Sequence, residues 1–223
     1  MSEPWKRREV IGNAVLYLGD CLDVLPTLPK VDAVITDPPY GMDLDTDYSG
    51  FSSWGAKGTK YERIVGDDNP FDPSPFLSLA TVCIFWGAQW FAHSLPISGG
   101  WLVFNKRGDG KPSEICFGDA ELAWCNRIKS VRLYSQMWHG VARRWSSEGC
   151  LHPTQKPIGL MEWCIRQAGE PAIILDPFMG SGTTGVACMN LGRKFIGIEI
   201  EPKYFAIACE RIENAQRQVR MFA

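Results

Sequence analysis

Short apolar runs alternate with longer amphipathic segments along most of this chain. The runs predict strands over 14–18, 31–36, 81–86, 101–106, 121–125, 132–138, 172–175 and 194–199. Helices are predicted over 157–167, 183–191 and 202–218, with shorter helical pieces after residue 21 and over 89–95. Nearly continuous apolar strands indicate a sheet that is covered on both faces. Strands that alternate with helices predict a Rossmann-like, doubly wound α/β sheet.

Two stretches depart from this alternation. Residues 41–72 are rich in Gly, Ser, Asp and Thr, and no hydrophobic period fits them. A loop of about 30 residues in a compact domain is usually functional or disordered, so we predict a mobile lid or substrate-contacting loop. Strands 121–125 and 132–138 are separated by a short polar segment, which predicts that they pair as a hairpin.

Length and composition indicate one globular domain over residues 1–223, with 45% hydrophobic and 22% charged residues. The N-terminal ten residues are charged, without the apolar segment of a secretory signal. No apolar run approaches the roughly 20 residues of a membrane helix. The eight cysteines form no C-x-x-C pair, and the three histidines have no metal-ligand spacing. These features predict a reduced, cytoplasmic protein with no metal site and no membrane partner.

The net charge of −2 is unevenly distributed. Residues 101–157 hold an excess of Lys and Arg, whereas residues 41–100 hold an excess of Asp and Glu. A basic segment in an acidic chain is either a solvated face or a surface that contacts phosphates.

The first candidate site is Thr36-Asp37-Pro38-Pro39-Tyr40-Gly41, at the end of a predicted strand. Two prolines fix φ and lack an N–H, so the corner is stiff and the Pro38 carbonyl has no ladder to join. Asp37 and this carbonyl can accept the two N–H bonds of an exocyclic amine, and Tyr40 can stack on a flat base. Taken alone, the same residues also suit a proline-rich turn after a buried strand.

The second candidate site is the glycine-rich stretch 175–184. Gly180 and Gly182 allow a ligand to approach the backbone, and Thr183 begins a helix whose N–H groups face that ligand. Glu199 ends the next predicted strand, about 20 residues after Asp176, where Rossmann-type sites hold ribose hydroxyls. An NAD site is the alternative, but no hydride-transfer site accompanies the stretch and the Asp37 corner has no role in one.

Together, the two motifs resemble those of the S-adenosylmethionine-dependent DNA amino-methyltransferases. Their order, with the catalytic corner first, is similar to the circularly permuted β class. Gly19-Asp20-Cys21 resembles the family's acidic turn at the cofactor adenine. Residues 152–157 and 195–199 resemble its proline-lysine segment and its ribose-binding strand, and 117–124 resembles a stretch of phage and prophage members.

This resemblance implies a mixed seven-stranded sheet with one antiparallel hairpin strand. It implies that catalysis rests with Asp37, Pro38, Pro39 and Tyr40. It implies that S-adenosylmethionine is bound by Asp20, Cys21, Asp37, Thr154, Lys156, Asp176, Pro177, Phe178, Gly180, Ser181, Gly182, Thr183 and Glu199. The resemblance also implies that the chain lacks the large recognition domain of longer relatives, so we expect target recognition within residues 41–151, with a small target-contacting region at 107–151.

The predicted reaction is direct methyl transfer to the N6 amine of an adenine that is flipped out of duplex DNA or already single-stranded. Arg143, Arg144 and Trp145 form a basic and aromatic loop, either a DNA contact or an ordinary exposed loop. The chain is predicted to act in the cytoplasm of a bacterial or phage-infected host cell, and a homodimer is left open.

Other targets and roles stay open. One is the cytosine N4 amine, although the family more often carries Ser at the Asp37 position for that target. Another is an RNA base or a protein amide, for which Asn is commoner there. A catalytically silent nucleic-acid-binding subunit is the third. Cytosine C5 methylation is set aside, because no Cys follows a Pro.

Overall fold

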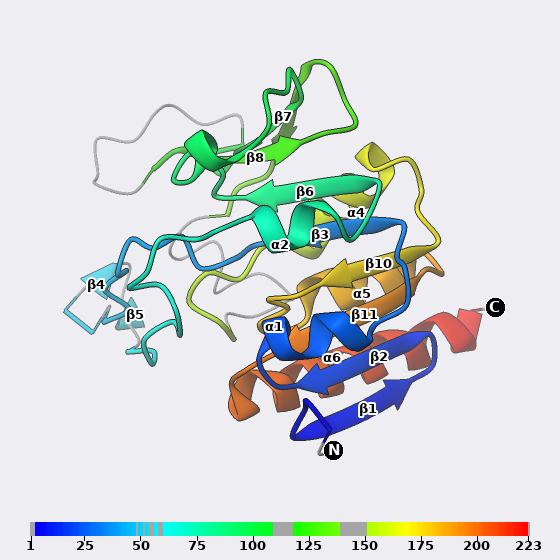
Figure 1. The fold of residues 1–223 in the computed structure, drawn as a ribbon. Helices are drawn as coiled ribbons and strands as arrows, with labels where there is room; N and C mark the ends of the chain where they lie inside the picture. The colour runs from blue at the N-terminus through cyan, green and yellow to red at the C-terminus, as the bar shows by residue number, and fades with distance from the viewer. Residues whose placement is uncertain are drawn as a thin grey trace.

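The computed structural model describes residues 3–47, 49–50, 52–53, 56–57, 60–108, 118–138 and 151–222. Within these ranges, nine strands form one mixed sheet in the order β1-β2-β11-β10-β3-β6-β8-β7-β9 (Figure 1). The strands are β1 (Arg7–Ile11), β2 (Ala14–Leu18), β3 (Ala33–Thr36), β6 (Val82–Trp86), β7 (Trp101–Asn105), β8 (Ala120–Cys125), β9 (Val131–Ser135), β10 (Ile173–Asp176) and β11 (Lys194–Glu199). A separate hairpin joins β4 (Ser52–Ser53) to β5 (Ala56–Lys57).

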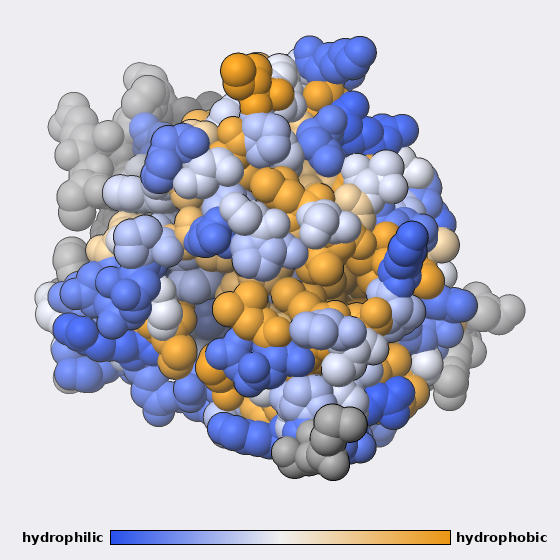
Figure 2. Space-filling model, viewed as in Figure 1, coloured by the Kyte–Doolittle hydropathy of each residue, from blue (hydrophilic) through white to orange (hydrophobic). Residues whose placement is uncertain are grey.

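Helices cover both faces of the sheet. The longer ones, α4 (Ile158–Gln167), α5 (Thr183–Asn190) and α6 (Pro202–Phe222), pack on one face. The short ones, α1 (Cys21–Val24), η1 (Leu25–Thr27) and α2 (Ser74–Leu77), lie on the other face, and η2 (Ala92–Ser94) follows β6 (Figure 1). Apolar side chains reach the surface on the face of α1 and α2 (Figure 2). No helix in the described ranges is long and apolar enough to cross a bilayer.

The side chains of the apolar strands pack into two hydrophobic cores, one on each face of the sheet. In β3, Ile35 packs into the core with α4, α5 and α6, whereas Val34 packs into the core with α1 and α2. Both side chains are fully buried. Burial on both faces explains why such strands lack a polar alternation, and it confirms the predicted doubly wound α/β class.

The strand count and the pairing of the edge differ from prediction. The sheet has nine strands, whereas the apolar runs predicted eight and the resemblance implied seven, and two of the nine, β1 and β8, run antiparallel to their neighbours. β1 escaped prediction because its sequence, Arg-Arg-Glu-Val-Ile, is charged and mostly exposed at the sheet edge.

The predicted hairpin of 121–125 with 132–138 is wrong. β8 lies between β6 and β7, and β9 pairs in parallel with β7 at the far edge. β8 carries fully buried Ala123 and Cys125, whereas β9 is largely exposed, so burial places the first inside the sheet and the second at its edge.

The sheet order places a crevice between β3 and β10. From β10 the chain continues through α5 to β11 on one side, and from β3 it leads to β6 on the other side. Open α/β sheets bind their ligands at such a switch point, outside the carboxyl ends of the strands. Asp37 follows β3 and Asp176 ends β10, and the Thr36 hydroxyl donates to Asp176 Oδ1 at 2.6 Å. Both predicted motifs therefore meet here.

Candidate active site

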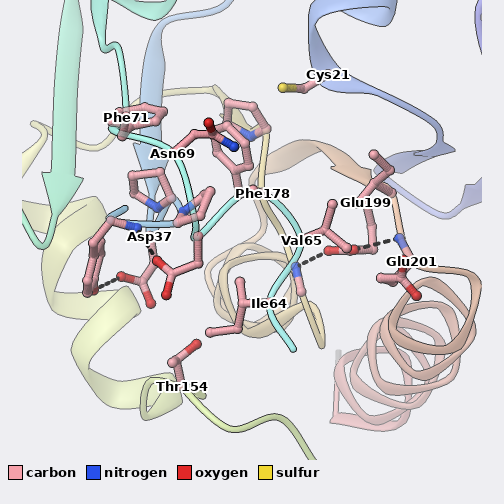
Figure 3. A pocket seen from close by; sticks show the side chains of 18 of the residues that line it. Cys21, Asp37, Ile64, Val65, Asn69, Phe71, Thr154, Phe178, Glu199 and Glu201 are labelled. Atoms are coloured by element: carbon pink, nitrogen blue, oxygen red, sulfur yellow. Dashed lines mark hydrogen bonds between the residues drawn. The ribbon is translucent and has the colours of Figure 1, made fainter. Parts of the chain in front are cut away.

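A cavity of about 390 Å³ lies at this crevice, a size typical of small-molecule sites (Figure 3). Its lining includes eleven of the residues predicted for the site: Asp20, Cys21, Asp37, Pro38, Pro39, Tyr40, Thr154, Pro177, Phe178, Gly180 and Glu199. An adjoining cavity of about 50 Å³ is lined by four more: Lys156, Asp176, Ser181 and Thr183. Gly182 lines neither cavity; it precedes α5 at φ +80°, where a Cβ would lie 2.9 Å from Ala208 Cβ.

Both carboxylate oxygens of Asp37 have partners. The Tyr40 hydroxyl donates to Oδ1, and Lys156 Nζ donates to Oδ2 at 2.5 Å. Burial raises the pKa of Asp37, while the Lys156 ammonium opposes that rise. The corner thus holds a carboxylate with preorganised donors around it.

Lys156 lies on the Asp37 side of the site and is almost fully buried. Its ammonium also contacts Glu121 Oε2 at 3.0 Å, and Glu121 Oε1 accepts from Lys106 at 3.0 Å. Sequence reasoning missed Glu121. The available signal was an acidic residue at the start of an apolar strand, since a charge that is partly withdrawn from water requires a partner.

Gly87 makes room for the Tyr40 ring. It follows β6 with φ +69°, and a Cβ at this position would lie 1.9 Å from a ring atom of Tyr40. A side chain here would therefore displace the ring. The sequence gives no local sign of this contact, because the two residues meet only through the pairing of β3 with β6.

Asp67, in the segment that follows the β4–β5 hairpin, binds the backbone of the Asp37 corner. Its buried carboxylate accepts the main-chain N–H groups of Tyr40 at 2.8 Å, Gly41 at 3.1 Å and Leu44 at 2.8 Å. Gly41, at φ +76°, packs so closely on this segment that a Cβ would lie 2.6 Å from the Asn69 carbonyl oxygen. One side chain therefore fixes the backbone around Tyr40.

We expect Asp67→Asn to lower the free energy of unfolding by about 1–3 kcal/mol, because the amide loses one accepted bond and points an N–H at the Leu44 N–H. Urea denaturation measures this change. Asp68→Asn is the matched control: Asp68 is the exposed neighbour and pairs only with the Asn69 amide in the described part of the chain. Equal stability of the two variants would contradict the assigned role of Asp67.

Asp176 stabilises the start of the glycine-rich stretch 175–184. Its carboxylate accepts the hydroxyls of Thr36 and Thr184, each at 2.6 Å, and the Phe178 N–H at 3.1 Å. Burial raises the pKa of Asp176 to about 6. Asp176 therefore shapes the turn at the start of the loop.

Glu199 closes the opposite end of the cavity. Its Oε2 accepts the Gly180 N–H and its Oε1 accepts the Glu201 N–H, both at 2.8 Å (Figure 3). Burial raises the pKa of Glu199 to about 7. Each oxygen keeps a second lone pair that a ligand hydroxyl can use. Asp20 also lines this end, while its carboxylate caps α1 through the Leu22 N–H at 2.8 Å.

Residues of the predicted 41–72 loop line the cavity between these two ends. Figure 3 shows Ile64 and Val65 between Asp37 and Glu199, and Phe71 and Asn69 near the corner. Val65 and Met42 are among the exposed apolar residues of the protein. An apolar rim of this kind suits a flat ring, and the role of the loop as a lid stays a prediction.

The predicted DNA contacts Arg143, Arg144 and Trp145 lie outside the described residues. Of the predicted target-contacting region 107–151, the structure describes 107–108, 118–138 and residue 151, which include β8 and β9. The assignment of this region to target contact also stays a prediction.

Comparison with known proteins gives matches over most of the chain. Residues 104–210 match the N6/N4 family described as DNA methylase. The chain is 26% identical to Type II methyltransferase M.HinfI of Haemophilus influenzae over 255 residues, which covers 91% of this chain and 68% of the relative. It is also similar to the solved M1.HpyAVI–SAM complex, with a TM-score of 0.56, 26% identity and coverage of 88% and 98%. The PvuII DNA methyltransferase (cytosine-N4-specific) gives a TM-score of 0.58 at 18% identity, with 96% of each chain covered, which shows the shared fold alone.

Proposed function

We propose that this chain is a DNA methyltransferase of the N6/N4 family and that it uses S-adenosylmethionine to methylate the exocyclic N6 amine of adenine. The observation that carries the proposal is the shared cavity, which has the Asp37 carboxylate at one end and the Glu199 carboxylate at the other. One end suits an amine donor, and the other suits a diol.

The residues present fit the cofactor. Glu199 offers two oxygens with free lone pairs to the ribose hydroxyls, and Gly180 and Gly182 adopt positive φ, which lets the loop turn closely around a ligand. Asp20 and Cys21 line the same end and suit the adenine ring. When bound, S-adenosylmethionine supplies an electrophilic methyl group.

Asp37 and Pro38 prepare the target nitrogen. In the described part of the chain, no hydrogen bond engages the Pro38 carbonyl oxygen, so it can accept one amine N–H while Asp37 accepts the other. The lone pair of an adenine amine is delocalised into the ring, and two such bonds favour a more tetrahedral nitrogen whose lone pair can point at the methyl group. Asp37 makes no covalent bond, and most of the acceleration comes from positioning and preorganised charge.

Tyr40 has two roles in the proposed reaction. Its hydroxyl bonds to Asp37 in the structure, and its ring lines the cavity and offers a flat surface on which a flipped base can stack. Entry of the base exchanges the hydroxyl bond for stacking, which offsets part of the cost of about a few kcal/mol for unstacking the base from DNA. Arg143, Arg144 and Trp145 are proposed to contact the DNA around that base.

The experiment is methyl transfer from labelled S-adenosylmethionine with purified protein. DNA, RNA and unrelated protein are offered as acceptors, and the labelled DNA is digested to nucleosides. We expect label in DNA only, as N6-methyldeoxyadenosine. Label in N4-methyldeoxycytidine would overturn the adenine assignment and keep the amino-methyltransferase, whereas label only in RNA or protein would overturn DNA as the substrate.

A further inference from the structure

Four charged side chains form a line that starts at the catalytic carboxylate. Lys156 Nζ lies 2.5 Å from Asp37 Oδ2 and 3.0 Å from Glu121 Oε2, and Lys106 Nζ lies 3.0 Å from Glu121 Oε1. The Lys156 side chain is only 7% exposed, so water does little to screen these contacts. Anions and cations alternate along the line, which leaves it neutral as a whole.

The antiparallel strand β8 brings Glu121 to this position. The parallel strands end at the catalytic edge of the sheet, whereas β8 begins there, so its second residue lies beside the site. Glu121 is paired in register with Phe104 of β7, and Lys106 directly follows β7. Lys156 comes from the segment before α4. Three segments of the chain thus supply the line of charges that starts at Asp37.

Lys156 and the target amine require the same acceptor. A charged donor binds a carboxylate more strongly than a neutral amine does, so an ammonium held by Asp37 alone would compete with the substrate. Glu121 offers that ammonium a second carboxylate at 3.0 Å. Glu121 therefore weakens the ion pair between Lys156 and Asp37, while the positive charge stays beside Asp37.

The same groups set the charge of Asp37. The titratable groups facing Asp37 are Tyr40 on its own corner, Lys156, Glu121 from β8 and Asp176 from β10. Burial raises the pKa of Asp37, Lys156 opposes that rise and Glu121 adds to it. Although burial acts to raise the pKa of Glu121, its two lysine partners lower it to about 2, so Glu121 stays ionised at working pH. Without Lys156, the half-buried carboxylates of Asp37 and Glu121 would face each other.

We propose that Glu121 is a positioning residue for methyl transfer, which holds Lys156 beside Asp37 so that the catalytic carboxylate stays charged and open to the substrate amine. The inference rests on the proposed function. Glu121 acts through Lys156, whereas Lys156 touches the reacting carboxylate.

The test is a cycle of three variants, Lys156→Met, Glu121→Gln and the double variant, with kcat and KM for DNA measured from pH 5 to 9. We expect Lys156→Met to lower kcat by about 100-fold, because a preorganised charge beside the reacting carboxylate is lost. The acid limb of the plot of kcat against pH should move to higher pH, since the pKa of Asp37 rises when no cation lies between Asp37 and Glu121. Glu121→Gln alone should raise KM for DNA about tenfold, with no upward move of that limb. The double variant should regain about tenfold in kcat over Lys156→Met, because the neutral amide no longer repels Asp37.

Glu213→Gln is the matched control, because it removes the partner of Arg217 in an exposed pair on α6 and should change neither kcat nor the pH profile. Lys156→Arg keeps the charge and should keep the wild-type acid limb, which covers the case in which Lys156→Met does not fold. If Glu121→Gln keeps the wild-type kcat and the wild-type KM for DNA, Glu121 has no positioning role and the inference is wrong. The proposed function fails separately, if the wild-type protein methylates no DNA.

Discussion

Replacing Asp37 by alanine is expected to reduce methyl transfer by about a thousandfold or more, while S-adenosylmethionine affinity stays within a few-fold. Loss of one preorganised electrostatic partner costs about 10²–10³ in rate, and here the amine also loses its anionic acceptor. Asp37 lies at the opposite end of the cavity from Glu199 (Figure 3). Single-turnover transfer of labelled methyl to DNA measures the first quantity, and titration calorimetry measures the second.

Asp37→Asn makes the same test without a change of shape. The amide oxygen accepts more weakly, and its NH₂ group opposes both the substrate amine and Lys156, so transfer should fall nearly as far. Lys156 retains Glu121 as a partner in either variant, which favours a folded protein. Asp68→Asn serves as the control for loss of one carboxylate. Loss of cofactor binding in parallel with transfer would show that Asp37 belongs to the cofactor end of the site.

The second large effect concerns cofactor binding and its pH dependence. Because burial raises the pKa of Glu199 to about 7, the carboxyl is largely ionised at pH 8 and largely protonated at pH 6. Ribose hydroxyls donate best to the ionised carboxylate, so the bound cofactor lowers the pKa of Glu199. The affinity for S-adenosylmethionine should therefore fall about tenfold from pH 8 to pH 6. Glu199→Gln should weaken binding at pH 8 by about 1–3 kcal/mol.

The variant also isolates the responsible group. The cofactor's own amino group titrates near this range, and it does so for both proteins. The difference between wild type and Glu199→Gln therefore reports Glu199 alone, and it should shrink as the pH falls. Calorimetric titration at pH 6, 7 and 8 measures it. A constant difference across this range would contradict the assigned role of Glu199.

The parts of the site that are local in sequence could be predicted. The two prolines after Asp37 and the glycines around Ser181 restrict or free the backbone by their own covalent geometry, so a single stretch carries the signal. The doubly wound class followed from strands such as β3, which is apolar on both faces. These residues reach one crevice because their strands are neighbours at the switch point.

Contacts made across the fold could not be predicted in the same way. Asp67, Gly87 and Glu121 support the site from 27 or more residues away in sequence, or through strand pairing that no local pattern encodes. The prediction that β8 pairs with β9 was wrong for a related reason, since hydrophobic alternation identifies a strand without identifying its partner. A carboxylate that serves the active site through another side chain becomes visible only in three dimensions.

We propose that the Asp37 corner directs a methyl group onto adenine N6 in DNA. The most direct test of this proposal is expression of the wild-type chain and of Asp37→Asn in a bacterial host without DNA methyltransferases of its own, with the modified bases in the host DNA quantified by mass spectrometry and mapped by sequencing. We expect N6-methyladenine in DNA from cells with the wild-type chain and none in DNA from cells with Asp37→Asn. Unmodified DNA from cells that contain the folded wild-type protein, or methyl groups found only on cytosine, would contradict it.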